Sequence, residues 1–283
     1  MKNEKKESSM LRFLYRTVLG RILLKLLTAR WISKVAGRFL DSGLSKPLIK
    51  RFVKKNSIDL SDFHSDSFRS FNDCFTRKIK DGKREMELSD SSLISPCDGL
   101  LTVYDITDET LVSVKGSQYS IYDLVKNEEL AKRYTSGICL VFRLCVNHYH
   151  RYIYIDDCRK GKNTFISGKL HTVRPIALEA TPVFKQNCRE YTVMETENFG
   201  TVTQIEVGAM LVGKIKNLHS EGEYKRGEEK GMFLYGGSTI VVLVENGQAS
   251  IKNEILYTVQ NGEEYSVRMG EEIGKKLNKK PSE

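Results

Sequence analysis

The pattern of apolar and polar positions changes once along the chain, near residue 90. Before this point apolar residues recur at helical spacing, as at Leu11, Leu14 and Val18. After it, short runs of apolar and β-branched residues alternate with turn residues, which is typical of strands. The sequence therefore predicts an α+β protein, with amphipathic N-terminal helices followed by a largely antiparallel β domain.

The predicted helices fall into two stretches. The first, residues 10–40, carries a basic residue every four or five positions, and the second, residues 67–80, follows a polar loop. Residues 81–92 are charged and rich in serine, which favours a domain boundary there. We therefore expect a basic helical region over residues 1–85 and a β-rich domain over residues 93–283.

The β-rich part contains one unusual predicted hairpin. We expect strands near residues 100–104, 138–146, 152–155, 201–207, 239–244 and 255–258, and one helix over residues 122–134. The apolar runs 233–235 and 240–244 form the predicted core hairpin. Two glycines, Ser238 and Thr239 lie between these runs, where the core would otherwise be continuous.

Charge changes the picture of the helical region. Residues 1–55 hold 15 Lys and Arg against three acidic residues, a net charge of +12, whereas the whole chain carries +9. The apolar runs are too short to span a bilayer, and the pattern fits helices lying in the interface of an anionic phospholipid membrane. The alternative is a set of ordinary amphipathic helices packed on the rest of the protein. No nucleic-acid-binding motif accompanies the charge, so we do not expect nucleic acid as a partner.

The six cysteines are scattered along the chain without CxxC spacing. This distribution indicates reduced thiols that mostly pack in the interior. The sequence predicts no metal site.

The Gly-Gly-Ser-Thr segment allows a specific reaction. By itself it is an ordinary turn, in which glycine supplies a positive φ. The chemical alternative is that the Ser238 hydroxyl attacks the Gly237 carbonyl and converts the peptide bond to an ester. β-Elimination would then split the chain and leave dehydroalanine, and its hydrolysis with loss of ammonia would leave a pyruvoyl group. Such a ketone can form a Schiff base and act as an electron sink.

Six short blocks accompany this segment, and together they carry a family resemblance. They are residues 70–77 (SFNDCFTR), 95–99 (SPCDG), 149–151 (YHR), 187–190 (NCRE), 208–215 (GAMLVGKI) and 227–233 (GEEKGMF). Their types and their order resemble the phosphatidylserine decarboxylases, a family of self-cleaving, pyruvoyl-dependent enzymes. The GGST segment is similar to the family's cleavage motif.

The resemblance implies cleavage between Gly237 and Ser238. The products would be an associated β chain, residues 1–237, and α chain, residues 238–283, with a covalent pyruvoyl group derived from Ser238. It further implies decarboxylation of phosphatidylserine to phosphatidylethanolamine through a Schiff base. The enzyme would lie peripherally at the cell membrane, on its cytoplasmic face. The oligomeric state, a homodimer included, is left open.

The resemblance also implies roles for individual side chains. Asp98 matches the family's relay aspartate, although an Asp-Gly pair alone is most simply a turn. The family pattern Asp-Tyr-His-Arg-x-His is only partly present. His150 matches its first histidine, which serves decarboxylation, whereas Ile153 occupies the place of the second, and His148 that of the aspartate.

The missing histidine leaves two interpretations. In the first, His171 replaces it, because residues 170–175 (LHTVRP) align with a family segment ending in Val-Asn-Pro, and imidazole suits proton transfer at neutral pH. In the second, self-cleavage is impaired and the protein is an uncut membrane-binding relative. Arg174, where the family has asparagine, could bind a substrate anion or pair with a glutamate. Another serine lipid or an amino acid is the alternative substrate.

Overall fold

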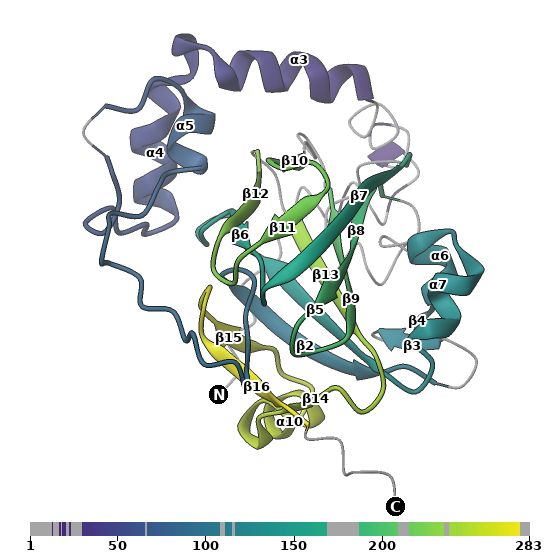
Figure 1. Cartoon of the computed structure of the whole chain (residues 1–283). Coiled ribbons are helices and arrows are strands. Elements are labelled where there is room, and N and C mark those ends of the chain that lie inside the picture. The colour runs from purple at the N-terminus through teal and green to yellow at the C-terminus, as the bar shows by residue number, and fades with distance from the viewer. Residues whose placement is uncertain are drawn as a thin grey trace, which may run out of the picture.

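The computed structural model describes residues 30–65, 67–107, 111–114, 117–168, 187–208, 215–234 and 238–277, together with residues 13, 17, 19, 20 and 23. Gly237, His171 and Arg174 lie outside these ranges. The described residues form helices at the N-terminal side and a β-rich body after them (Figure 1). The predicted α+β class is therefore confirmed.

An eight-stranded antiparallel sheet forms the centre of the β-rich body (Figure 1). In spatial order its strands are β11 (Gly222–Tyr224), β7 (Cys158–Ile166), β8 (Arg189–Thr196), β9 (Thr201–Val207), β13 (Ser238–Val244), β5 (Ile138–Leu144), β2 (Gly99–Asp105) and β15 (Tyr265–Val267). All seven residues of β13 are buried, and the strand pairs with β5 and β9. A strand covered on both faces reads as a continuous apolar run, which explains residues 240–244.

Alternate residues of β13 face two different parts of the core. Ile240 and Val242 belong to the larger hydrophobic cluster, whereas Val241 and Leu243 belong to a second cluster. The second cluster is covered by α6 (Ile121–Val125) and α7 (Glu128–Arg133). The same alternation places Ser238 on the side of the larger cluster.

Three smaller sheets complete the β-rich body. They are β10 (Ile215–Asn217), β12 (Glu229–Phe233) and β6 (Arg151–Ile153); β1 (Ser92–Ile94), β16 (Glu272–Lys276) and β14 (Ala249–Ile251); and the hairpin β3 (Leu111–Val114) with β4 (Ser117–Ser120). Helix α10 (Asn253–Gln260) precedes β15 and packs on the larger cluster through Ile255.

The N-terminal helices form a separate small cluster. They are α3 (Arg30–Asp41), the 3₁₀ helix η1 (Gly43–Ser45), α4 (Pro47–Lys55) and α5 (Phe71–Phe75). Leu40, Phe71 and Phe75 are buried between them, and Leu234, which follows β12, packs on this cluster. None of the described helices is both long and apolar enough to cross a membrane.

The predicted hairpin of residues 233–235 and 240–244 is wrong, because β12 and β13 belong to different sheets. Both edges of β12 are taken by β10 and β6, and both edges of β13 by β5 and β9. Gly231 permits the close packing of β12, since a Cβ there would lie 2.6 Å from the carbonyl oxygen of Lys216. The segment around Gly237 therefore connects two sheets.

Three predicted elements also differ from the structure. The helix expected over residues 122–134 is two helices, because Lys126 adopts a left-handed conformation with φ of 54° and the Asn127 side chain caps α7. The strand expected over residues 255–258 lies within α10. The helix expected over residues 67–80 is reduced to α5, and Ile79 forms a β-bridge with Phe63.

Candidate active site

Ser238 and Asp98 lie at the same end of the central sheet. Ser238 begins β13 and pairs with Leu144, the last residue of β5. On the other side of β5, Leu100 pairs with Arg143, and Asp98 comes two residues earlier. Two interstrand spacings amount to about 10 Å. Asp98 therefore lies at the same end of the sheet as Ser238, at a distance too large for a direct hydrogen bond between strands of this spacing.

Asp98 is held by an arginine that the sequence analysis did not single out. Arg84 donates from Nη1 to Oδ1 at 2.5 Å and from Nη2 to Oδ2 at 3.3 Å. The backbone N–H of Met269 also donates to Oδ1, at 2.8 Å. Since planar guanidinium and carboxylate groups pair through two parallel hydrogen bonds, Arg84 fixes the orientation of the Asp98 carboxylate. From the sequence, Arg84 belongs to the charged segment 81–92, which predicts only a domain boundary.

A pocket of about 230 Å³ opens beside the turn that carries Asp98. Its walls include Arg84, Tyr149, Arg151 and Ile153, and no histidine of the described residues lines it. Ile153 is buried, and its N–H donates to the carbonyl of Pro96, two residues before Asp98. Ile153, which the sequence comparison places where the family has its second histidine, therefore borders a cavity next to Asp98.

His150 is fully buried and neutral. Its Nδ1 lies 2.9 Å from the carbonyl oxygen of His148, and because a carbonyl only accepts, Nδ1 carries the proton. Burial lowers the pKa of His150 to about 3. Its ring packs against Phe75 at 4.0 Å between centroids. Nε2, the acceptor nitrogen, is buried and has no hydrogen-bond partner among the described residues.

The segment 145–150 connects β5 and β6, which pair with the two strands that flank the predicted cleavage site, β13 and β12. It follows Leu144, which pairs with Ser238, and it ends at His150, whose carbonyl accepts from Phe233 N at 2.9 Å. His148 closes a tight turn, because its Nδ1 accepts from Cys145 N at 3.1 Å. The two histidines therefore lie in a turn before β6, on the cleavage-site end of the sheet.

A buried charge network lies on the same face as Ser238. Glu206 on β9 pairs with Ile240, so it is a diagonal neighbour of Ser238 across the sheet. Its carboxylate accepts from Lys230 Nζ at 2.7 Å, and both side chains are fully buried. Asn217 also bonds to both residues. Because Lys230 is on β12, the pair joins the sheet that precedes the cleavage segment to the sheet that follows it.

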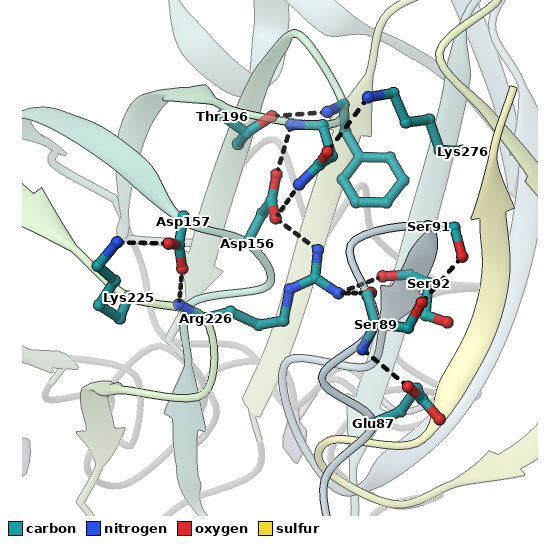
Figure 2. Close-up of polar contacts among 12 residues, drawn as sticks. Glu87, Ser89, Ser91, Ser92, Asp156, Asp157, Thr196, Lys225, Arg226 and Lys276 are labelled. Carbon is teal, nitrogen blue, oxygen red and sulfur yellow. Dashed lines mark hydrogen bonds and ion pairs between the residues drawn. The ribbon is translucent and has the colours of Figure 1, made fainter. Parts of the chain in front are cut away.

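Figure 2 shows a second buried ion pair, between Asp156 and Arg226. Arg226 also donates to the carbonyl of Ser92, and Asp156 accepts from the backbone N–H of Asn198 at 2.7 Å. Lys276 reaches the side chain of Asn198 at 3.1 Å. These bonds fix the start of the 225–229 segment, which lines the pocket through Gly227 and Glu229.

The structure describes some of the predicted site residues and not others. The structure brings Ser238, Asp98 and His150 to one end of the sheet, whereas Gly237 and His171 lie outside the described residues. Within the described ranges, no group of three or more His, Cys, Asp or Glu side chains could hold a metal ion.

Comparison with known proteins identifies the family of this chain. The phosphatidylserine decarboxylase family matches residues 71–275. Phosphatidylserine decarboxylase proenzyme 2 of Clostridium acetobutylicum is 45% identical over 269 residues, 95% of this chain and 92% of that protein. The phosphatidylserine decarboxylase proenzyme of Ruminiclostridium cellulolyticum is 40% identical over 277 residues, 96% and 92% of the two chains. The chain therefore belongs to the phosphatidylserine decarboxylase family of pyruvoyl-dependent carboxy-lyases.

Proposed function

We propose that this protein is a proenzyme that cuts itself between Gly237 and Ser238 and then decarboxylates phosphatidylserine to phosphatidylethanolamine. The observation that carries the proposal is the position of Ser238 at the first residue of the buried strand β13, at the same end of the sheet as Asp98 and His150. Membership of the family supports the same reaction.

In the cut, the Ser238 hydroxyl attacks the Gly237 carbonyl and a base takes its proton. The distance of about 10 Å between strands β13 and β2 requires a group between Ser238 and Asp98. We assign this role to His171, with Asp98 as the residue that orients it and Arg84 as the residue that orients Asp98. Strand β7 ends at Ile166, five residues before His171, and its partner β8 begins at Arg189, which pairs with Val207 at the end of the sheet where Ser238 lies; this proximity in the chain supports the assignment.

The surroundings of Ser238 fit a pyruvoyl group. When formed, this group supplies an electrophilic carbonyl that accepts the electron pair released as carbon dioxide leaves the substrate. The strand keeps its first residue buried, which excludes water from the reacting atoms. His150 presents its unpartnered Nε2 in the neighbouring turn, so it can accept a proton from the substrate amine and return it.

The two products of the cut would remain associated. The α chain would begin with β13, which pairs on both edges with strands of the β chain. It would also contain β16, which pairs with β1 of the β chain. Extraction of the α chain would break these ladders and expose a fully buried strand.

The helical region is the part that we assign to the membrane. Exposed apolar side chains occur on α3, η1 and α4, among them Leu44 at 78% exposure and Val35 at 60%. Exposed basic residues lie between them along the chain, for example Arg38 and Lys46. The mixture suits the interface of an anionic leaflet, and the cytoplasmic leaflet carries that charge. We place the boundary between this region and the catalytic domain at residues 86–92.

The mass of the purified protein tests the cut. We expect a fragment of residues 238–283 with a blocked N-terminus, and carbon dioxide release from phosphatidylserine by the same preparation. The variant Ser238→Ala should give one uncut, inactive chain. An uncut wild-type protein would favour the membrane-binding relative instead. Cutting together with turnover of only another serine compound would overturn the substrate assignment.

The base is tested separately. His171→Ala should slow cutting by about 100-fold or more, in line with the usual contribution of a general base. His64→Ala, which changes an exposed histidine, is the control. If His171→Ala cuts at the rate of the control, then His148 or His150 must take the proton.

A further inference from the structure

Arg77 is a buried arginine whose hydrogen-bonding capacity is mostly unused. Its side chain follows α5, is 3% exposed and packs over the ring of Phe63 at 4.6 Å. Nη2 donates to the carbonyls of Asn147 and His148 at 3.0 and 3.3 Å. Nε and Nη1, which carry three of the five N–H donors of an arginine, are buried and without partners among the described residues.

A second buried arginine, Arg189, has the hydrogen bonds expected of an arginine with a purely structural role. Arg189 is also buried, and each of its three nitrogens donates to a backbone carbonyl: Nε to Leu124 at 2.7 Å, Nη1 to Asn187 at 2.9 Å and Nη2 to Asp123. Arg77 uses one nitrogen for this purpose. Because a buried charge without partners is unfavourable, its free donors indicate an anionic ligand.

Among the described residues, no carboxylate forms an ion pair with Arg77. Asp98 is the carboxylate that acts on the Arg77 charge, and both oxygens of Asp98 are taken by Arg84. The site therefore keeps one positive charge that no described carboxylate binds.

Arg77 converges with His150 on a single atom. Arg77 Nη2 and His150 Nδ1 lie 3.3 and 2.9 Å from the carbonyl oxygen of His148. Each side chain thus has one nitrogen on this oxygen and other nitrogens free. The free groups are complementary in kind, since Arg77 offers donors and the neutral His150 offers an acceptor at Nε2.

This pair lies beside the cleavage site. The carbonyls that bind Arg77 belong to the turn between Leu144, which pairs with Ser238, and His150, which pairs through its carbonyl with Phe233 N. Arg77 is thus fixed to the segment that joins the neighbours of both strands flanking Ser238.

We propose that Arg77 and His150 together bind the head group of the substrate, with Arg77 on the phosphodiester and His150 Nε2 on the amine. This inference rests on the proposed function. It adds Arg77 as a residue that would select amines carrying a phosphodiester. A serine that is part of a phosphodiester presents an anion and an N–H donor on one small group, as the two side chains require.

The phosphodiester is favoured over the carboxylate for a physical reason. A cation that binds the departing carboxylate stabilises the ground state and loses its partner as carbon dioxide forms, which slows the reaction. The phosphodiester keeps its charge throughout. Its contact with Arg77 can therefore anchor the substrate without opposing decarboxylation.

Two soluble competitors distinguish the two anions. Glycerophosphoethanolamine has a phosphodiester and an amine, and O-methylserine has a carboxylate and an amine. Their inhibition constants would be measured with phosphatidylserine in detergent micelles, for the cut wild-type enzyme and for Arg77→Gln. Intact mass would confirm that each sample is cut.

We expect Arg77→Gln to raise the KM for phosphatidylserine and the inhibition constant of glycerophosphoethanolamine by about 10-fold or more, the usual effect of losing a charged hydrogen bond. The constant for O-methylserine should change less than threefold. The reverse order, an equal loss for both competitors, or no inhibition of the wild-type enzyme by glycerophosphoethanolamine would overturn the proposal. A wild-type protein that neither cuts nor decarboxylates would instead overturn the proposed function.

Two further variants separate binding from folding. Arg77→Lys keeps the charge and should retain more of the glycerophosphoethanolamine inhibition than Arg77→Gln. If Arg77→Gln does not fold, Arg77→Ala with added guanidinium takes its place, and restored inhibition would support the proposal. Arg189→Gln removes the fully bonded arginine and should lower the melting temperature without changing the ratio of the two inhibition constants. A changed ratio in Arg189→Gln would show that loss of packing alone explains the effect.

Discussion

Asp98 is bound by Arg84 at both carboxylate oxygens, and the backbone N–H of Met269 adds a third bond. The carboxylate is therefore oriented by residues from two distant parts of the chain. In the proposed relay, Asp98 would keep its position whichever imidazole approaches it. This arrangement is compatible with a histidine that comes from a different segment than residue 153.

The first prediction concerns Arg84. Arg84→Gln should slow self-cleavage by about 10-fold or more, because charge-assisted hydrogen bonds contribute roughly 1.5–3 kcal/mol and their loss frees the Asp98 carboxylate to rotate. The half-life of the uncut chain, followed by denaturing gel electrophoresis after translation, measures the effect. Arg159→Gln is the control, since Arg159 pairs with Glu195 at the exposed surface. Equal half-lives for the two variants would show that Arg84 does not contribute to self-cleavage.

The second prediction uses the buried imidazole of His150. Its pKa is about 3 when folded and about 6.5 when unfolded, so the unfolded chain binds the proton first as the pH falls. Stability is unaffected by this group above pH 6.5 and decreases between pH 6.5 and 3. In the uncut Ser238→Ala background, lowering the pH from 7.5 to 5.0 should cost about 2 kcal/mol more than in Ser238→Ala/His150→Gln.

Urea unfolding at the two pH values measures this difference. All other titrating groups are common to the two chains, so their contributions cancel in the comparison. A parallel pH dependence of the two chains would mean that the pKa of His150 is the same in the folded and the unfolded chain.

The third prediction concerns the buried pair of Lys230 and Glu206. Lys230→Met leaves the Glu206 carboxylate buried without its cation, and should lower the free energy of unfolding by about 3–5 kcal/mol. The double variant Lys230→Met/Glu206→Gln should recover at least about half of this loss, because no charge remains buried. Lys132→Met, which breaks an exposed pair with Glu128, should cost less than about 1 kcal/mol. Additive losses in the double variant would contradict a direct interaction.

The fourth prediction tests the membrane assignment. Lys50→Glu/Lys54→Glu reverses two exposed charges on α4, and each basic residue near an anionic surface contributes about 1 kcal/mol. Binding to vesicles that contain 30 mol% phosphatidylglycerol, measured by flotation, should therefore weaken by about 30-fold or more. Lys126→Glu/Lys132→Glu, on the α6–α7 side of the molecule (Figure 1), should bind like the wild type. Equal losses would indicate attraction by net charge alone.

Several strands were predictable because their patterns admit one interpretation. The run 201–207 is β9 as expected, and the apolar run 240–244 lies within the central strand β13. Residues 255–258 were misassigned because their apolar, β-prone side chains also fit a short helix. In the structure Ile255, Leu256 and Val259 contact the core at helical spacing, while Tyr257 is 70% exposed.

Pairing between distant segments was not predictable. Strands that follow each other in sequence often pair as hairpins. Here β12 pairs with β10 and β6, and β13 pairs with β9 and β5, so the two consecutive strands do not pair with each other. The hydrogen bonds between Arg84 and Asp98 could not be predicted for the same reason, because an arginine within a charged segment is usually exposed to solvent. Asp98 and His150 are candidates only through the family resemblance, because isolated Asp-Gly and His residues are common in turns, and their roles stay predictions.

The packing of Leu234 into the cluster of α3, α4 and α5 has a consequence for how a lipid is handled. If these helices lie on the bilayer, the C-terminal end of β12, five residues before Ser238, is held close to the membrane surface. In that case the acyl chains would remain in the bilayer, and only the polar head group would have to enter the site. Such an enzyme processes its substrate in two dimensions, and the product never has to be carried through water.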